Sequence, residues 1–143
     1  MTGLLRRMVV LFIVASAINY PWEVLQMPLY TGQGDWLTFA RHCLLPSLGD
    51  GVILEIIFLC GVIVFGSASW ADRPGLTGYA VMLGLGAVIS VAVEWGAVHV
   101  LDRWSYAPGM PLWPGVDVGL VPVLQMLVLP PIAFALTARW LRQ

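Results

Sequence analysis

Residues 50–69 read DGVILEIIFLCGVIVFGSAS, an apolar run in which Asp50 and Glu55 are the acidic side chains. At a helical rise of about 1.5 Å per residue, such a run is about 30 Å long, which matches the hydrocarbon core of a bilayer. The run is therefore predicted to be a membrane-spanning helix. Three further runs of similar length and polarity are found at residues 8–27, 77–100 and 118–138.

The composition of the whole chain agrees with a membrane environment. Of its 143 residues, 59% are hydrophobic and 10% are charged, and the mean hydropathy is +0.87, which excludes a soluble enzyme. The basic residues are all arginine and the net charge is -1, so we expect no nucleic-acid partner. The length allows one transmembrane domain over residues 1–143. The predicted fold is all-α, an integral membrane antiparallel four-helix bundle.

The arginines predict the orientation of this bundle. Two of them lie in the long links, residues 28–49 and 101–117, and the others lie at the chain ends or in the short link at residues 70–76. The positive-inside rule then places both termini in the cytoplasm and the long links outside, as in a multi-pass protein of the bacterial inner membrane. In an alternative interpretation the first run is a signal peptide, cleaved after Ala15-Ser16-Ala17.

Each predicted span carries a polar side chain close to its outer end. Glu23, Glu55, Glu94 and Gln125 lie at depths of about 6 to 10 Å in their spans, so they are expected to form one layer around a cavity that opens outward. A buried carboxyl that keeps its proton can donate it, and an ionised one can accept a proton. Glu23, Glu55 and Glu94 are therefore the candidate catalytic residues.

Further polar residues near this layer are candidates for ligand binding. Asn19 and Gln26 share one face of the first span with Glu23, because they lie four residues before it and three after it. Arg103, just beyond the third span, is predicted to be the counter-ion of Glu94 and Glu55, whereas Asp50 is expected to cap the start of its helix. The complete set of candidate binding residues is Asn19, Gln26, Asp50, His99, Arg103, Tyr106 and Gln125.

Two patterns predict how the helices pack, and neither indicates a metal or a cofactor. The pairs Ala80 and Gly84, and Gly86 and Ser90, are spaced to let a neighbouring backbone approach closely. The segment at residues 36–45 is expected to lie as an interfacial helix over the cavity.

No metal-ligand spacing or cofactor motif is present, so neither a metal ion nor a cofactor is predicted. Five tryptophans are expected to form an interfacial belt: Trp22, Trp36, Trp95, Trp104 and Trp113.

Several segments carry a resemblance to known proteins. They are NYPWEVLQMPLY at residues 19–30, SLGD at 47–50, Glu94-Trp95, RWSY at 103–106 with Met110-Pro111, and GLVPVLQ at 119–125. Together they resemble segments of small uncharacterised bacterial multi-span membrane proteins, a resemblance that covers most of the chain and implies no particular activity. More remotely, four spans with carboxylates in the membrane and an Arg-Trp-x-Tyr segment are similar in topology to lycopene cyclase-type domains and to sterol-isomerase (emopamil-binding)-like domains.

Two functions from different classes fit these observations. The first is acid-base chemistry on a lipid or isoprenoid ligand held in the polar cavity. The alternative is a non-catalytic membrane component, either a complex subunit or a small-ligand binder, whose polar layer fixes helix packing. The expected partners are membrane lipids, a lipid or isoprenoid ligand, and an oligomer or larger membrane complex.

Overall fold

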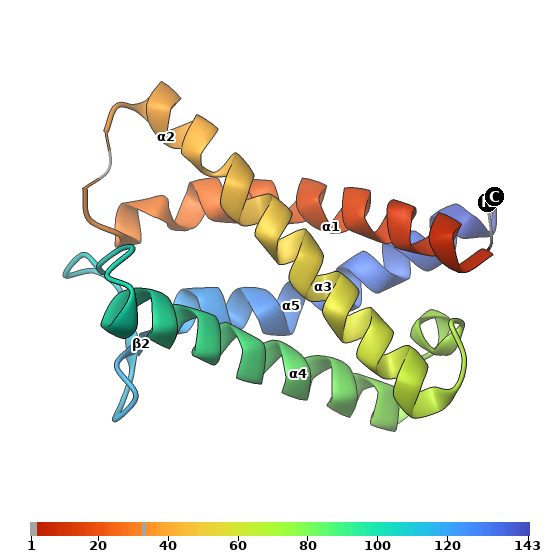
Figure 1. The fold of residues 1–143 in the computed structure, drawn as a ribbon. Coiled ribbons are helices and arrows are strands. Elements are labelled where there is room, and N and C mark those ends of the chain that lie inside the picture. The colour runs from red at the N-terminus through yellow and green to blue at the C-terminus, as the bar shows by residue number, and fades with distance from the viewer. Residues whose placement is uncertain (1–2, 33) are drawn as a thin grey trace.

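Four long helices make up the bundle (Figure 1). The computed structural model describes residues 3–32 and 34–143, apart from the side chains of Trp36 and Phe39. All four helices are long and apolar enough to cross a membrane, which confirms the prediction of an all-α four-helix bundle. The helices are α1 (Gly3–Gln26), α3 (Leu44–Phe65), α4 (Gly75–Trp95) and α5 (Leu120–Leu141).

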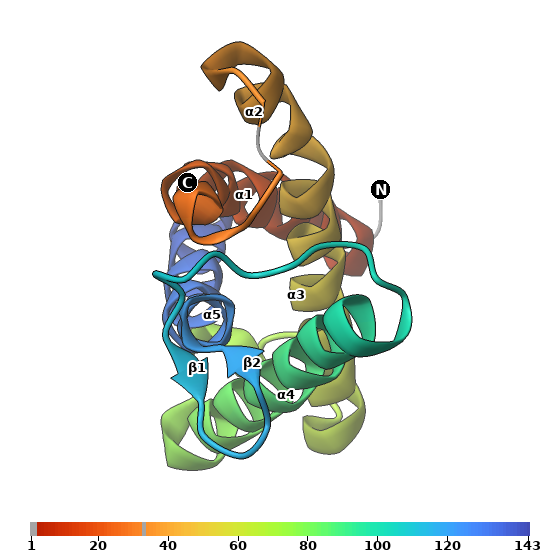
Figure 2. The same ribbon diagram turned by 90° about the vertical axis from the view of Figure 1, so that its left-hand side faces the viewer.

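The helices alternate in direction and form a closed ring of neighbours. In this ring α1 packs against α3 and α5, and α4 packs against the same two helices from the other side (Figure 2). The short link with η2 (Trp70–Asp72) lies at the same end as the start of α1 and the end of α5 (Figure 1). An ion pair between Arg7 and Asp72, with two hydrogen bonds, ties α1 to this link.

The half of the bundle near the short link has an apolar core built around Trp70. The Trp70 ring stacks on Phe65 at a centroid distance of 5.4 Å and meets Phe134 edge-on at 5.6 Å. Its Nε1 donates a hydrogen bond to the backbone oxygen of Phe58 at 3.1 Å. Gly61 makes room for the ring, because a Cβ atom there would lie 2.1 Å from it. The buried polar side chains described below lie toward the opposite end.

The helix α3 begins earlier than the sequence predicts. It starts at Leu44, and α2 (Trp36–His42) precedes it along nearly the same line, pointing away from the bundle (Figure 1). Pro46 lies in the first turn of α3, where proline is tolerated, so it does not end the helix. Asp50 is therefore inside the helix, and its predicted capping role is wrong. The predicted interfacial helix at residues 36–45 is formed by α2 and the first residues of α3; it is directed away from the bundle (Figure 1), and among its described side chains only His42 and Leu45 line the cavity described below.

The link between α4 and α5 contains structure that the sequence did not indicate. The helix α4 continues into one π-helical segment, η3 (Gly96–Val100), and a small hairpin follows, with β1 (Leu112–Trp113) antiparallel to β2 (Val118–Gly119). Gly115, with a φ of 79°, supplies a left-handed residue in the turn between these strands.

The two long links are joined to each other across one end of the bundle. Tyr30, just after η1 (Met27–Leu29), forms an isolated antiparallel β-bridge with Tyr106. The backbone nitrogen of Ala107 donates to the oxygen of Leu29 at 2.9 Å, which extends this pairing. The second link therefore passes over the ends of the helices (Figure 2) and brings two tyrosines together.

The small residues of α4 divide between two faces. A Cβ atom on Gly86 would lie 2.4 Å from the backbone oxygen of Met126, and Ser90 donates to the oxygen of Pro122 at 3.1 Å. This pair thus brings α4 close to α5, as predicted. Ala80 and Gly84 are exposed instead, because residues two apart on a helix lie about 200° apart around its axis.

Candidate functional site

Gln125 on α5 is the centre of a buried polar network that joins three helices. Its Nε2 lies 2.8 Å from Asn19 Oδ1, 3.0 Å from Glu23 Oε1 and 2.7 Å from Asp50 Oδ2. The side chain amide has two N–H groups, which these three acceptors share. Because Gln125 is only 2% exposed, this single amide connects α1 and α3 to α5 inside the apolar bundle.

The polar face of α1 supplies the other donors of the network. Gln26 Nε2 donates to Glu23 Oε1 at 2.8 Å and to Gln125 Oε1 at 3.1 Å. The Nε1 of Trp22 in turn donates to Gln26 Oε1 at 3.2 Å. Asn19, Glu23 and Gln26 are all buried, so the spacing of these residues in the sequence correctly predicted one shared face. The Gln26 amide thus satisfies a carboxyl group that could not otherwise lie in an apolar interior, while the Asn19 amide donates to the backbone oxygen of Ala15 at 2.8 Å.

Glu23 and Asp50 form a pair of carboxyl groups across the contact between α1 and α3. Glu23 Oε1 and Asp50 Oδ2 both accept from Gln125 Nε2, at 3.0 Å and 2.7 Å, so the two carboxyl groups lie side by side in the buried network. Two carboxyl groups this close in an apolar interior repel each other when both are ionised, and one proton held by the pair relieves this repulsion. The pair is thus a place where one proton can be held by two residues.

Glu94 on α4 forms a second and different carboxyl site. Its Oε2 accepts a hydrogen bond from the Tyr106 hydroxyl at 2.7 Å and a longer one from Trp104 Nε1 at 3.4 Å. The Tyr30 hydroxyl lies 3.5 Å from Oε1. All three partners are neutral donors, which is the surrounding that an ionised carboxylate needs. The β-bridge between the two long links places both tyrosines here.

The tyrosines at this site keep their protons. Burial, followed by the neighbouring Glu94 charge, raises the pKa of Tyr30 well above its ordinary value of 10.0. Burial and the hydrogen bond to Glu94 raise the pKa of Tyr106 in the same direction. Both hydroxyls therefore remain donors to Glu94 over the physiological range.

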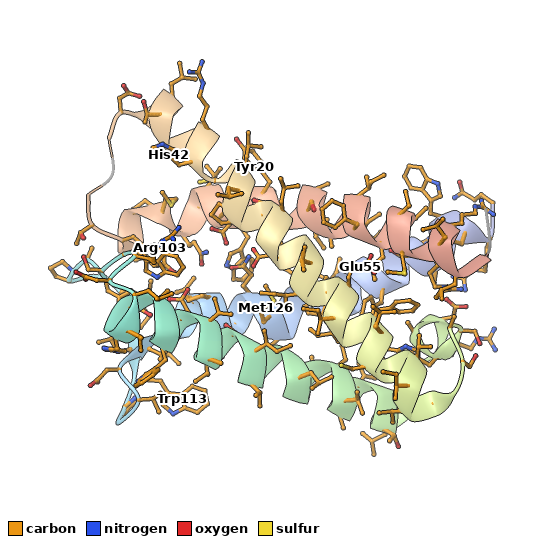
Figure 3. The ribbon with its side chains drawn as sticks, in the orientation of Figure 1. Tyr20, His42, Glu55, Arg103, Trp113 and Met126 are labelled. Carbon is orange, nitrogen blue, oxygen red and sulfur yellow. The ribbon has the colours of Figure 1, made fainter. Side chains whose placement is uncertain are left out.

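Both carboxyl sites line one cavity of about 610 Å³. Glu23, Asp50 and Gln125 contribute to its wall from the first site, and Glu94 contributes from the second. Arg103 and His42 lie at the end covered by the long links (Figure 3), and both are exposed. The remaining walls are mostly apolar and include Leu45, Ile53, Val93, Pro122 and Met126.

The cavity reaches the surface of the bundle between α3 and α4. These two helices diverge toward the end that carries the long links (Figure 1). Leu45 on α3 and Val93 on α4 both line the cavity, and they are 73% and 45% exposed. Gly49, which also lines the cavity, has open space where a Cβ atom would lie. A lateral opening therefore connects the carboxyl sites to the surface of the apolar helices.

Glu55 does not belong to this cavity, contrary to the sequence prediction. It lies about 140° around the α3 axis from Asp50, since successive residues turn by about 100°. Its two carboxyl oxygens are buried near Phe12 of α1, without a hydrogen-bond partner in the part of the chain that the structure describes. Equal depth alone suggested that Glu55 would join the layer, but the packing of α3 against α1 and α4 brings Asp50 there instead.

His99 lies outside the cavity, whereas Arg103 lines it but does not take the predicted role of counter-ion. His99 is exposed, its Nε2 is 3.1 Å from the backbone oxygen of Asp117, and its ring packs beside Trp95, outside the cavity. Arg103 lines the cavity, but it forms no ion pair within the part of the chain that the structure describes. The predicted counter-ion of Glu94 is replaced by three neutral hydrogen-bond donors, Tyr30, Trp104 and Tyr106.

Sequence reasoning missed two members of the Glu94 site. Tyr30 was not a candidate, and Trp104 was assigned to the interfacial belt. No signal in a single sequence shows that residues 30 and 106 pair, because the pairing joins two irregular links far apart in the chain. The side chain of Trp36, another predicted belt member, lies outside the described residues.

The fold and the site together define a class: a helical bundle with the properties of a multi-pass membrane protein and a carboxyl-lined cavity within its spans. Comparison with family models, curated proteins and solved structures gives no match. Among the described residues, no three His, Cys, Asp or Glu side chains are grouped as the ligands of a metal ion would be.

Proposed function

We propose that the protein binds a lipid or isoprenoid in this cavity and transfers protons to and from it. The observation that carries the proposal is that two different carboxyl sites face one cavity. Glu23 and Asp50 lie side by side and can hold one proton, and the hydrogen-bond partners of Glu94 are three neutral donors. Acid-base catalysis requires an acid and a base that both reach the bound molecule.

The reaction that fits this arrangement is migration of a carbon-carbon double bond. The proton held by Glu23 and Asp50 adds to one alkene carbon, the π electrons form the new C–H bond, and a cation remains on the adjacent carbon. The carboxylate of Glu94 then removes a proton from a neighbouring carbon, and that C–H electron pair forms the new double bond. Proton exchange with water at the Arg103 end of the cavity restores both sites.

The ligand class follows from the walls and from the resemblance. The apolar lining and the lateral opening suit a molecule that is already dissolved in the bilayer. The topological similarity to lycopene cyclase-type and emopamil-binding-like domains supports an isoprenoid, because those domains act on such lipids.

A second candidate function is a non-catalytic binder or complex component. The observation in its favour is the Gln125 network, which satisfies the carboxyls of Glu23 and Asp50 while it fixes the packing of three helices. In that case the carboxyls hold the bundle together and carry out no chemistry.

Deuterium incorporation separates the two candidates. The purified protein is incubated in D₂O with geranylgeraniol, an alcohol with four alkene groups, and the mass of the recovered alcohol is measured. The acid-base proposal predicts deuterium at carbon, loss of incorporation in Glu94→Gln, and retention in the control Glu55→Gln, whose residue lies outside the cavity. Unlabelled alcohol from the parent protein would overturn the proposed chemistry.

We further infer that both termini lie in the cytoplasm and the long links outside, on the strength of the arginine asymmetry. Cys43 is buried and makes a poor reporter, so the test uses a variant with Cys43→Ala and Cys60→Ala. This variant receives either Pro108→Cys in the second long link or Ser67→Cys just after the end of α3, on the side of the short link; both positions are exposed. An impermeant maleimide added outside intact cells should label only the first. The reverse result would invert the orientation.

A further inference from the structure

The lateral opening between α3 and α4 can hold an extended hydrocarbon chain. It runs from the carboxyl sites past Ile53 to the exposed side chains of Leu45 and Val93. In the middle of this path, Gly49 leaves open space at the position of a side chain. An extended hydrocarbon chain could therefore lie against the α3 backbone and continue into the surrounding lipid without displacing a residue.

The inner end of the cavity is rich in hydrogen-bond acceptors. Three carboxyl groups line it, from Glu23, Asp50 and Glu94. A carboxylate can accept about four hydrogen bonds; Gln26 and Gln125 both donate to Oε1 of Glu23, and Trp104 and Tyr106 both donate to Oε2 of Glu94. A ligand head that donates a hydrogen bond, such as a hydroxyl, would meet unused acceptors here.

An anionic head would fit this inner end poorly. The cationic side chains of the cavity, Arg103 and His42, are exposed and line its end under the long links (Figure 3), whereas Glu23 and Glu94 are buried. A phosphate placed between the carboxyl sites would face like charge in an environment of low dielectric constant.

From these contacts we propose that the ligand is a long-chain alcohol taken up sideways from the bilayer. Its hydroxyl lies between Glu23 and Glu94, and its chain occupies the opening along Gly49 between α3 and α4. This inference rests on the proposed function for the identity of the cavity as the binding site. It adds the head group and the path of the ligand, neither of which depends on the proposed chemistry.

The test measures binding of geranylgeraniol to the purified protein in dodecyl maltoside by thermal shift. We expect the alcohol to raise the Tm by at least about 2 °C at saturating concentration, and geranylgeranyl phosphate to give a much smaller shift. In Gly49→Trp the indole fills the opening, so the apparent Kd for the alcohol should rise by at least about tenfold. Gly84→Trp is the matched control, because Gly84 is exposed on α4, has open space at its Cβ position and does not line the cavity.

The outcomes distinguish the parts of the inference. Equal or stronger stabilisation by the phosphate overturns the assigned head group. An equal Kd in Gly49→Trp and Gly84→Trp overturns the assigned path, and Gly49→Leu repeats this comparison if the tryptophan variant does not fold. Normal alcohol binding that depends on Gly49, together with no deuterium incorporation, supports this inference and rejects the proposed chemistry.

Discussion

At the scale of single residues, Gln125 explains how two acidic side chains are accommodated between apolar helices. Its amide is the shared donor to Glu23 and Asp50, and its oxygen accepts from Gln26. A buried polar group that loses its partner costs about 1–3 kcal/mol, which is more than the hydrogen bond itself contributes.

Replacing Gln125 by leucine should therefore destabilise the protein. Gln125→Leu keeps a similar volume but leaves the carboxyl pair without its donor, and we expect a loss of about 1–3 kcal/mol in the free energy of unfolding. The measurement is thermal or denaturant unfolding in detergent, with Gln143→Leu at the exposed end of the chain as the control. A Gln125→Leu variant as stable as the control would show that the network does not support the fold.

The tyrosines beside Glu94 give a pH-dependent prediction. Because burial raises the pKa of Tyr30 and Tyr106, their contribution to stability is fully present below the ordinary tyrosine pKa of about 10 and decreases as the pH rises above it. Ultraviolet titration of the folded protein should show two of its four tyrosines ionising above the usual range. Tyr106→Phe should remove one of them. Ionisation of all four in a single step near pH 10 would contradict the Glu94 site.

At the scale of secondary-structure elements, close packing of α4 on α5 holds Glu94 and Gln125 at the same cavity. The contact depends on Gly86, since a Cβ atom there would lie 2.4 Å from the Met126 backbone oxygen. Backbone cannot move aside as a flexible side chain can, so the two helices would have to separate.

Gly86→Ala and Gly84→Ala form a matched pair on the same helix. We expect Gly86→Ala to cost about 1–3 kcal/mol of stability because of overpacking. Gly84→Ala meets no atom within 4 Å and should be neutral or stabilising by up to about 1 kcal/mol, since alanine favours the helix. Thermal unfolding of the two variants in detergent compares them directly. Equal stabilities would show that α4 and α5 are not in close contact at Gly86.

At the scale of the whole molecule, the sequence was sufficient for the number and class of the helices. Four apolar runs predicted four helices, and the spacing within 19–26 predicted a polar face on α1. The rotation of α3 was not predictable, because it depends on how the helix packs against α1 and α4, and this packing determines that Asp50 and not Glu55 lies beside Glu23. The Glu94 site could not be predicted either, since long-range pairing of Tyr30 with Tyr106 creates it.

The central claim is that a proton-holding carboxyl pair lies in a cavity open to lipid. Dicyclohexylcarbodiimide tests it most directly, because this reagent partitions into membranes and modifies protonated carboxyl groups. After treatment of the protein in membranes and peptide mass spectrometry, the account predicts modification at Glu23 or Asp50, reduced when geranylgeraniol is present and in Gly49→Trp. Absence of modification at both residues, or modification confined to the exposed Asp102 and Asp117, would contradict it.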